Sequence, residues 1–126
     1  MKGSLQVLFR PDRKSYVRGP RPRGCVFCKA QKSKDTLIIF QGEHCFVTMN
    51  KFPYNTGHLL ILPKRHVGDF EKLTSAEHHE IHWLLREVIR ITKSAQKPAG
   101  INVGLNLGRA AGAGIPKHLH YHVIPR

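Results

Sequence analysis

Three histidines near the end of the chain alternate with apolar residues. His118, His120 and His122 are each separated by a single residue. Because alternate side chains of an extended strand point to the same side, this spacing predicts a row of imidazole rings on one face of a strand over residues 118–124. Three large polar rings on one face must each have a partner. The residues alone leave two uses open: a set of metal ligands, or covalent catalysis.

Covalent catalysis would divide the work between neighbouring histidines. A neutral imidazole is a good nucleophile towards phosphorus when an acceptor holds one of its ring nitrogens protonated. A second histidine can then donate a proton to the departing oxygen. The central residue, His120, is the best-supported nucleophile, and His122 is the candidate for proton donor or phosphate contact.

A glycine-rich segment precedes the histidines. Residues 106–117 carry few bulky side chains, and Arg109 and Lys117 are the cations within it. Gly112 and Gly114 allow conformations in which successive backbone N–H groups converge on an anion. Such donors stabilise the charge that builds on a phosphate during its transfer. The segment and the histidines together predict chemistry on phosphate.

Two cysteines form a C-x-x-C motif near the start of the chain. Cys25 and Cys28 have the spacing at which two thiols can hold one metal ion in a turn, and zinc would need two further ligands. The chain has 3 cysteines in all, which do not make a disulfide framework. The third, Cys45, lies in an apolar stretch and is interpreted as a core thiol. This usage indicates a reducing, cytoplasmic setting.

The chain of 126 residues is long enough for one domain. Its net charge is +13, from 21 Lys and Arg against 8 Asp and Glu. Such a field attracts nucleotides, polyphosphates or nucleic acid. Residues 1–23 are rich in arginine and proline and are interpreted as a basic N-terminal arm. No stretch of about 18 consecutive apolar residues occurs, so we expect no membrane span.

Apolar stretches and the histidine stretch predict the strands of a sheet. The predicted strands span residues 36–40, 44–49, 58–63, 101–108 and 118–124. One long helix over residues 74–97 falls between the third and fourth strands. This order predicts an α+β domain with a mainly antiparallel sheet.

The predicted helix has clear end signals. Thr74 and Glu77 fit a capping box at its start, and Pro98 ends it. The apolar stripe consists of Ile81, Leu84, Leu85, Val88 and Thr92. Three histidines on this helix are expected on its solvated face, because the metal motif H-E-x-x-H is not completed. They are His78, His79 and His82.

Taken together, these motifs resemble the histidine triad (HIT) family. Residues 118–124 match its His-φ-His-φ-His-φ-φ pattern residue for residue, and the segments 24–28, 50–66 and 106–114 resemble the family in the same order. The resemblance extends over residues 24–126. The Gly-Arg-Ala-Ala-Gly-Ala-Gly-Ile segment, with Pro-Arg after the triad, is most similar to the prokaryotic diadenosine tetraphosphate (Ap4A) hydrolase and phosphorylase branch.

The resemblance implies a fold and a domain organisation. We expect a HIT domain over residues 24–126, preceded by the basic arm over 1–23. Its fold would be a mainly antiparallel five-stranded sheet with one long helix and a short N-terminal zinc-binding turn. Because relatives usually continue after the triad, we also expect a C-terminal segment to be missing after Arg126. Family members generally form homodimers through the helix and adjoining strands, so we expect a homodimer.

The resemblance also implies an activity. The enzyme would cleave dinucleoside polyphosphates through a nucleotidyl-histidine intermediate, with His120 attacking the α-phosphorus and His122 binding phosphate and assisting the leaving group. Water or inorganic phosphate would then release a mononucleotide. The implied substrate contacts are Asn50 to the ribose, and Asn106 with the backbone of Gly112, Ala113 and Gly114 to the phosphates. Phe46 is a weaker candidate for the base pocket.

Family members with a leading C-x-x-C motif often bind structural zinc. Carried over, the ligands would be Cys25, Cys28, His66 and His118. They lie too far apart in the sequence for a self-folding zinc finger, so the fold would have to assemble the site. His118 would then have a structural role, with two histidines remaining for catalysis.

Two other functions remain open at this stage. A zinc-containing nucleic-acid-binding module would fit the basic charge, although only 8% of the residues are aromatic and could stack on bases. Alternatively, a HIT hydrolase could act on nucleoside phosphoramidates or on adenylylated nucleic-acid ends, which keeps the fold and changes the substrate.

Overall fold

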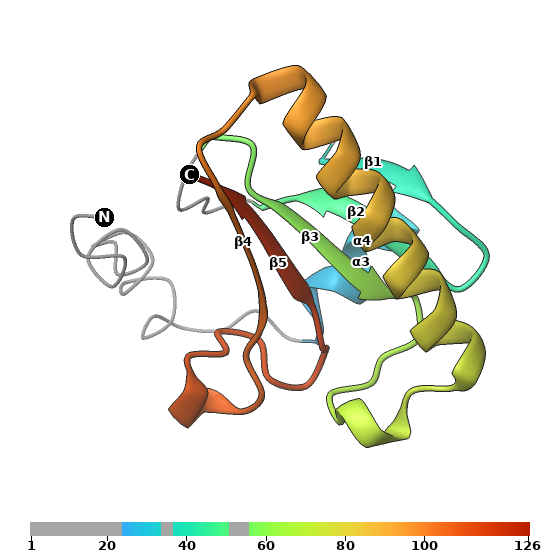
Figure 1. The fold of residues 1–126 in the computed structure, drawn as a ribbon. Helices are drawn as coiled ribbons and strands as arrows, with labels where there is room; N and C mark the ends of the chain where they lie inside the picture. The colour runs from blue at the N-terminus through green and yellow to red at the C-terminus, as the bar shows by residue number, and fades with distance from the viewer. Residues whose placement is uncertain (1–23, 34–36, 51–55) are drawn as a thin grey trace.

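The computed structural model describes residues 24–33, 37–50 and 56–126. Its strands form one sheet in the order β1-β2-β3-β5-β4, and all neighbouring strands are antiparallel (Figure 1). The strands are β1 Ile38–Gln41, β2 Cys45–Met49, β3 Leu59–Pro63, β4 Ile101–Leu105 and β5 Tyr121–Pro125. The predicted α+β fold class is therefore confirmed. The basic arm predicted over residues 1–23 lies outside the described residues.

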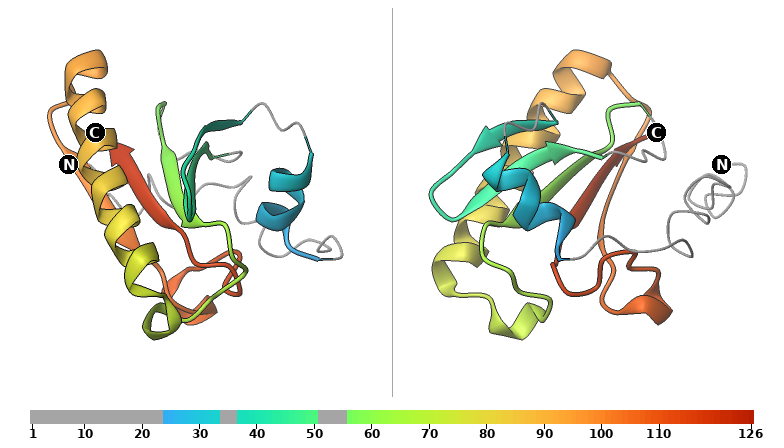
Figure 2. Two further views of the ribbon diagram at one scale, coloured as in Figure 1. Left: turned by 90° about the vertical axis from the view of Figure 1, so that its right-hand side faces the viewer. Right: turned by 180° about the vertical axis from the view of Figure 1, so that it is seen from behind.

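The long helix α4, Ser75–Gln96, crosses one face of this sheet (Figures 1 and 2). The predicted capping box is present: the Thr74 hydroxyl accepts the Glu77 N–H at 3.1 Å, and the Glu77 carboxylate accepts the Thr74 N–H at 2.8 Å. The helix ends at Gln96 and is followed by its C-cap Lys97, whose φ of 47° is left-handed, directly before Pro98. None of the helices in the described part of the chain has the length and apolar character needed to cross a bilayer.

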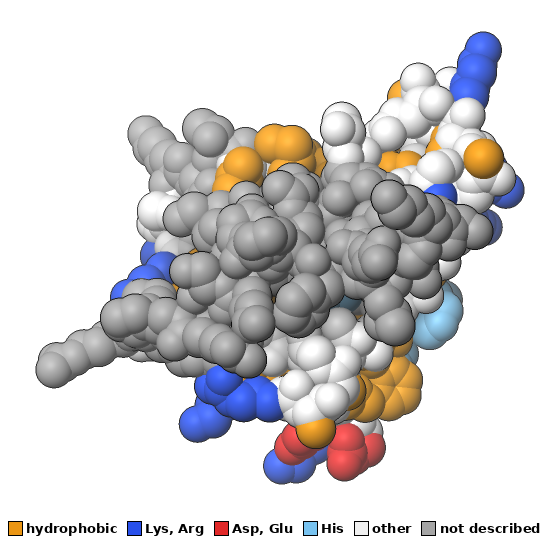
Figure 3. Space-filling view, turned by 90° about the vertical axis from the view of Figure 1, so that its left-hand side faces the viewer, with side chains coloured by type: hydrophobic (Ala, Val, Ile, Leu, Met, Phe, Trp, Pro, Cys, Tyr) orange, Lys and Arg blue, Asp and Glu red, His pale blue; other side chains and the backbone are white. Residues whose placement is uncertain are grey.

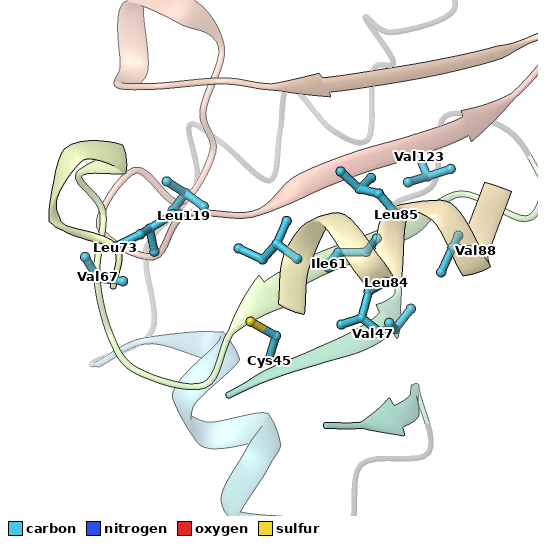
Figure 4. Packing of buried hydrophobic residues seen from close by; sticks show 11 residues of the cluster. Cys45, Val47, Ile61, Val67, Leu73, Leu84, Leu85, Val88, Leu119 and Val123 are labelled. Atoms are coloured by element: carbon cyan, nitrogen blue, oxygen red, sulfur yellow. The ribbon is translucent and has the colours of Figure 1, made fainter. Parts of the chain in front are cut away.

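The main core lies between α4 and the sheet face that it covers, which we call the α4 face. The predicted stripe of α4 is buried, from Ile81 to Thr92, and its aliphatic members meet the side chains of β2, β3 and β5 (Figure 4). The buried members of the cluster are Cys45, Val47, Ile61, Val67, Leu73, Ile81, Leu84, Leu85, Val88, Leu119 and Val123. Cys45 is a core thiol, as predicted.

The opposite face of the sheet, which we call the histidine face, carries the short helix α3, Val26–Lys32 (Figure 2). Its buried Phe27 packs against Phe46, Leu60 and Leu62 of the sheet. The C-x-x-C motif was expected to form a turn, but Cys25 is instead the N-cap of this helix, and Cys28 lies in its first turn. Packing of Phe27 into this apolar cluster stabilises the short helix.

The histidine strand begins later than predicted. β5 starts at Tyr121, so His118 and His120 precede the strand and only His122 lies within it. Pro63 has no N–H for the ladder between β3 and β5, which stops at the pair Ile61 and Tyr121. The Leu119 N–H bonds the Val67 carbonyl instead, at 2.8 Å. The alternation survives, because Leu119 enters the α4-face core while the histidines are buried outside that cluster.

Candidate active site and metal centre

Four ligand atoms from three distant segments converge beside the start of α3. Cys25 and Cys28 come from α3, His66 from the segment after β3, and His118 from the segment before β5, and these atoms all lie within 4.8 Å of one another. This cluster contains all four residues that the resemblance implied as ligands. It is the one such cluster among the described residues.

Four of the six donor–donor distances within this cluster fit the edges of a tetrahedral metal site, and the other two are at most 4.8 Å. His118 Nδ1 lies 3.3 Å from Cys25 Sγ, 3.5 Å from Cys28 Sγ and 3.3 Å from His66 Nδ1. Cys28 Sγ lies 3.5 Å from His66 Nδ1. A tetrahedron with zinc–ligand bonds of about 2.0–2.3 Å has edges of roughly 3.3–3.8 Å. The four donors can therefore hold one such ion.

The protonation of His118 also suits a ligand. Its Nε2–H donates to the Pro63 carbonyl at 2.8 Å, which leaves the Nδ1 lone pair facing the cluster. Burial lowers the pKa of His118 to about 4, so its ring is neutral at physiological pH. The pKa of Cys28 is raised, first by burial and then by the neighbouring Cys25 thiol. A bound dication would reverse that effect and favour the thiolate.

Gly68 allows the segments that carry the two histidine ligands to approach closely. A Cβ at this position would lie 2.6 Å from the Pro116 carbonyl oxygen and 3.0 Å from Lys117 Cα. Because only glycine fits this approach, His66 and His118 are drawn together by the backbone that surrounds them.

His120 is held by its own chain. It is buried, and its Nδ1 lies 2.9 Å from the His118 carbonyl oxygen. A carbonyl can only accept, so Nδ1 carries the proton and the Nε2 lone pair is available for attack. The His120 and His122 rings are adjacent, with their centroids 5.0 Å apart. The two predicted catalytic residues therefore lie side by side.

His58 belongs to this group of histidines, although its sequence position did not suggest a role. It is 2% exposed, and its Nε2 lies 2.9 Å from His122 Nδ1. The Asn50 amide nitrogen lies 3.2 Å from His58 Nδ1. If this amide donates, His58 carries its proton on Nε2 and donates it to His122 Nδ1, which places the His122 proton on Nε2. The sequence signal that could have found it is its position directly before the apolar residues 59–63, because a histidine next to such a strand is buried with it.

The glycine-rich segment folds into a short 3-10 turn, Arg109–Ala111. The Gly112 and Ala113 N–H groups donate within the segment, to the carbonyls of Arg109 and Gly108. Gly112 has a φ of 101°, and a Cβ there would lie 3.7 Å from the Asn106 amide nitrogen. In this conformation the segment therefore brings Asn106 to Gly112 but uses two of its predicted phosphate donors internally.

The remaining candidate residues do not join the cluster of ligand atoms or the paired histidines. Phe46 is fully buried beside Phe27, so its ring presents no free face to a base. On α4, His79 and His82 are exposed, as expected for a solvated face. His78 packs its ring against Phe70, with centroids 4.8 Å apart.

Comparisons with known proteins match the family that the sequence motifs resemble. The family model of the HIT domain matches residues 31–126. A Mycobacterium tuberculosis protein named AP-4-A phosphorylase is 41% identical over 99% of this chain and 70% of its own length.

Solved structures share the fold. A HIT family protein from Bacillus anthracis has a TM-score of 0.74 and 29% identity, over 84% of this chain and 75% of its own. A Zn-bound histidine triad family protein from Mycobacterium smegmatis has a TM-score of 0.72 and 26% identity, over 82% of this chain and 75% of its own.

Proposed function

This chain belongs to the HIT domain family, and on that premise we propose that it is an enzyme that cleaves dinucleoside polyphosphates of the Ap4A type through a nucleotidyl-histidine intermediate. The observation that carries this proposal is the pairing of His120 and His122. One has its Nδ1 proton held by a backbone carbonyl, and the other lies beside it at the end of a hydrogen-bonded chain.

The first step is attack by His120 Nε2 on the α-phosphorus. The bond from this phosphorus to its bridging oxygen breaks and its electron pair stays with the leaving nucleotide, whose oxygen accepts a hydrogen bond from His122 Nε2–H. The His120 Nδ1–H keeps its bond to the His118 carbonyl, which stabilises the charge that develops on the ring. Since His58 and Asn50 set the tautomer of His122, they support its role as a hydrogen-bond donor to the leaving oxygen.

The second step releases the nucleotide from His120. An oxygen of inorganic phosphate or of water attacks the α-phosphorus, and the bond to His120 Nε2 breaks and returns that ring to its neutral form. Any proton on the attacking oxygen passes to the solvent. Phosphate would yield ADP and water would yield AMP, with ATP as the other product in both cases. The name of the relative from M. tuberculosis, AP-4-A phosphorylase, favours phosphate.

The substrate contacts are part of the proposal. Asn50 binds the ribose through its amide oxygen, while its amide nitrogen holds His58. Asn106 and the segment of Gly112, Ala113 and Gly114 bind the phosphates, together with His122. Phosphate oxygens must compete with the Arg109 and Gly108 carbonyls for the N–H groups of this segment. Asn106 is therefore the first donor that the substrate would meet.

The charge of the chain suits an anionic substrate. The net charge of +13 attracts polyphosphates over a distance of about one Debye length. On the side of the molecule shown in Figure 3, Lys and Arg side chains lie around the rim, and the acidic side chains in view lie together at the lower end.

Zinc is the metal that we propose for the cluster of Cys25, Cys28, His66 and His118. Two thiolates with two imidazoles are a typical structural zinc set, and the solved relative from M. smegmatis is Zn-bound. When bound, the ion would supply cross-links between α3 and the two histidine segments. Because its ligands include reduced thiols, we place the enzyme in the cytoplasm.

A homodimer is also part of the proposal. β4 pairs with β5 and with no other strand in the described part of the chain, so its second edge presents backbone donors and acceptors. Val103 on this strand is 44% exposed. A second copy could pair with this edge and cover it. We further propose that residues 24–126 form the catalytic unit and that residues 1–23 are an accessory arm.

The decisive experiment is incubation with Ap4A, with and without inorganic phosphate, followed by product analysis. ADP plus ATP formed only with phosphate is the result we expect. AMP plus ATP without phosphate would make the enzyme a hydrolase of the same mechanism. Salt-sensitive binding of nucleic acid with no cleavage of any nucleotide would favour the zinc-containing nucleic-acid-binding module instead.

His120→Asn tests the mechanism directly. Asparagine can still donate to the His118 carbonyl but has no nucleophilic nitrogen. We expect turnover to fall by roughly 10⁴-fold or more, as for other nucleophile deletions, while binding of a non-cleavable Ap4A analogue persists. Near-normal turnover in this variant would rule out the proposed intermediate.

A further inference from the structure

Phe27 links the cysteine pair to the proposed nucleophile. It stands between Cys25 and Cys28 in the sequence, and α3 directs it into the histidine face. Its ring centroid lies 5.1 Å from that of His120 and 5.5 Å from that of His118. One buried phenyl ring therefore contacts both a metal-ligand candidate and the catalytic candidate.

The orientation of the His120 ring depends on such contacts. Its hydrogen bond to the His118 carbonyl fixes the position of Nδ1 but still allows the ring to rock about that bond. Phe27 packs on the ring at a tilt of 54°, and His122 packs on it at an angle of 61°. These rings restrict that motion. In-line attack tolerates little displacement, since a misplacement of about 1 Å can cost roughly a hundredfold in rate.

The position of Phe27 depends in turn on the cysteines at its two sides. Both thiols point to the cluster that contains His118 Nδ1, at 3.3 Å and 3.5 Å. A metal ion held by these donors would tie the first turn of α3 to the segment that carries His120. α3 is only 7 residues long, and so short a helix is marginal without tertiary contacts.

We propose that Phe27 is a positioning residue for His120, and that metal binding by Cys25 and Cys28 keeps its ring in place. The metal centre then acts on catalysis through a side chain that touches neither the metal nor the substrate. This inference rests on the proposed role of His120 as the nucleophile.

Phe27→Leu is the test variant, because it keeps an apolar side chain and removes the flat ring. The matched control is Phe46→Leu, the same change in the same buried cluster. We expect Phe27→Leu to lower kcat for Ap4A cleavage by about tenfold to a hundredfold, with KM changed by less than about threefold. Phe46→Leu should lower the melting temperature at least as much and leave kcat within about threefold of the parent.

Metal binding provides the second measurement. Cobalt(II) titration, followed by the absorption of its thiolate complex, should give a similar affinity in Phe27→Leu and in the parent, because all four donors remain. In the parent, histidine NMR should show the His120 ring signals sharpening when metal binds, and this response should be lost in Phe27→Leu. If Phe27→Leu does not fold or loses the metal, Phe27→Met replaces it with a longer side chain.

The outcomes separate this inference from the proposed function. A metal-loaded Phe27 variant with the parent's kcat, or a Phe46→Leu variant that loses as much kcat, would overturn the positioning role. His120→Asn is measured in the same assay. If it remains active, the proposed function fails; if it is inactive while the Phe27 variants are normal, only this inference fails.

Discussion

The two faces of the sheet are built from the same strands but bury different chemistry. Beneath α4, the buried side chains are mainly aliphatic, and they pack without any demand for a particular protonation state. On the histidine face, four histidines are buried among the described residues: His58, His118, His120 and His122. Each of these rings is fixed by a named partner: a carbonyl, another histidine or the cysteine pair.

This difference separates stability from function. Burying an aliphatic side chain contributes roughly 1.5–3 kcal/mol to folding, whereas a buried polar ring costs free energy unless it is hydrogen-bonded. The buried histidines therefore stabilise the fold less and specify the arrangement of reactive groups more. Changes to these histidines should impair activity, and changes to the aliphatic residues of the α4 face should impair stability alone.

Removal of the metal should have the largest effect, because it should lower both the stability and the activity of the protein. Cys28→Ser removes one of four donors, so we expect loss of the bound zinc, a lower melting temperature and reduced turnover. Metal present at a thousandfold above its dissociation constant stabilises the folded state by about 4 kcal/mol. Elemental analysis and thermal unfolding measure these effects.

Cys45→Ala is the matched control for the metal experiment. Cys45 is fully buried on the α4 face, and burial raises its pKa to about 12, so it is an inert thiol. This variant should lose stability but keep its zinc and its kcat. Equal zinc content in Cys28→Ser and the parent protein would contradict the assignment of the ligands.

His58→Gln should have the next largest effect, and it should be confined to activity. The change interrupts the chain from Asn50 to His122, so the His122 proton is no longer directed to Nε2. We expect kcat to fall by roughly a hundredfold, as when one donor to a developing negative charge is removed, with zinc content unchanged. Steady-state kinetics with Ap4A would measure it.

The control for His58→Gln is the same substitution at His82, which is exposed on α4 and bonds only the helix carbonyl of His78 in the described structure. His82→Gln should leave kcat unchanged. An equal loss in the two variants would show that the effect of His58 is not specific to the histidine face.

The α4 face could be predicted from the sequence because its signals are local. The capping box needs only Thr74 and Glu77, which are three residues apart, and the buried stripe follows the helical period. The fold class followed from the order of these elements. What decided the start of β5 was not local: the missing N–H of Pro63 acts on a strand far along the chain.

The histidine face could be predicted only in part. The alternation of the triad was visible, and the resemblance named the four metal-ligand candidates that the structure brings together. His58 was missed because its partner, His122, lies 64 residues away. Phe27 was missed because an aromatic residue inside a C-x-x-C motif gives no indication of where its ring will point until α3 is docked.

The smallest effect that we expect tests the α4 face at its polar end. Glu77 is buried, and its carboxylate accepts two hydrogen bonds from Arg65, at 2.9 Å and 3.1 Å. Chiefly because of these bonds, the pKa of Glu77 is lowered from its usual 4.5. A depressed pKa contributes stability above the value of the unfolded state, and this contribution is lost as the pH falls through the folded value.

Glu77→Gln should therefore lower the free energy of unfolding by about 1–2 kcal/mol at neutral pH, a range that allows for the half-exposed Arg65. The difference from the parent should vanish in acid, where the parent carboxylate is protonated. Denaturant titrations at both pH values measure this, with a chelator present so that metal release contributes nothing. Glu87→Gln, at an exposed pair with Arg90 on the same helix, should have a smaller effect. Because the carboxylate of Glu77 bonds Arg65 and Thr74 and none of the residues proposed to act on the substrate, kcat and KM should stay within about twofold of the parent. A larger loss of kcat would mean that the two faces are not independent.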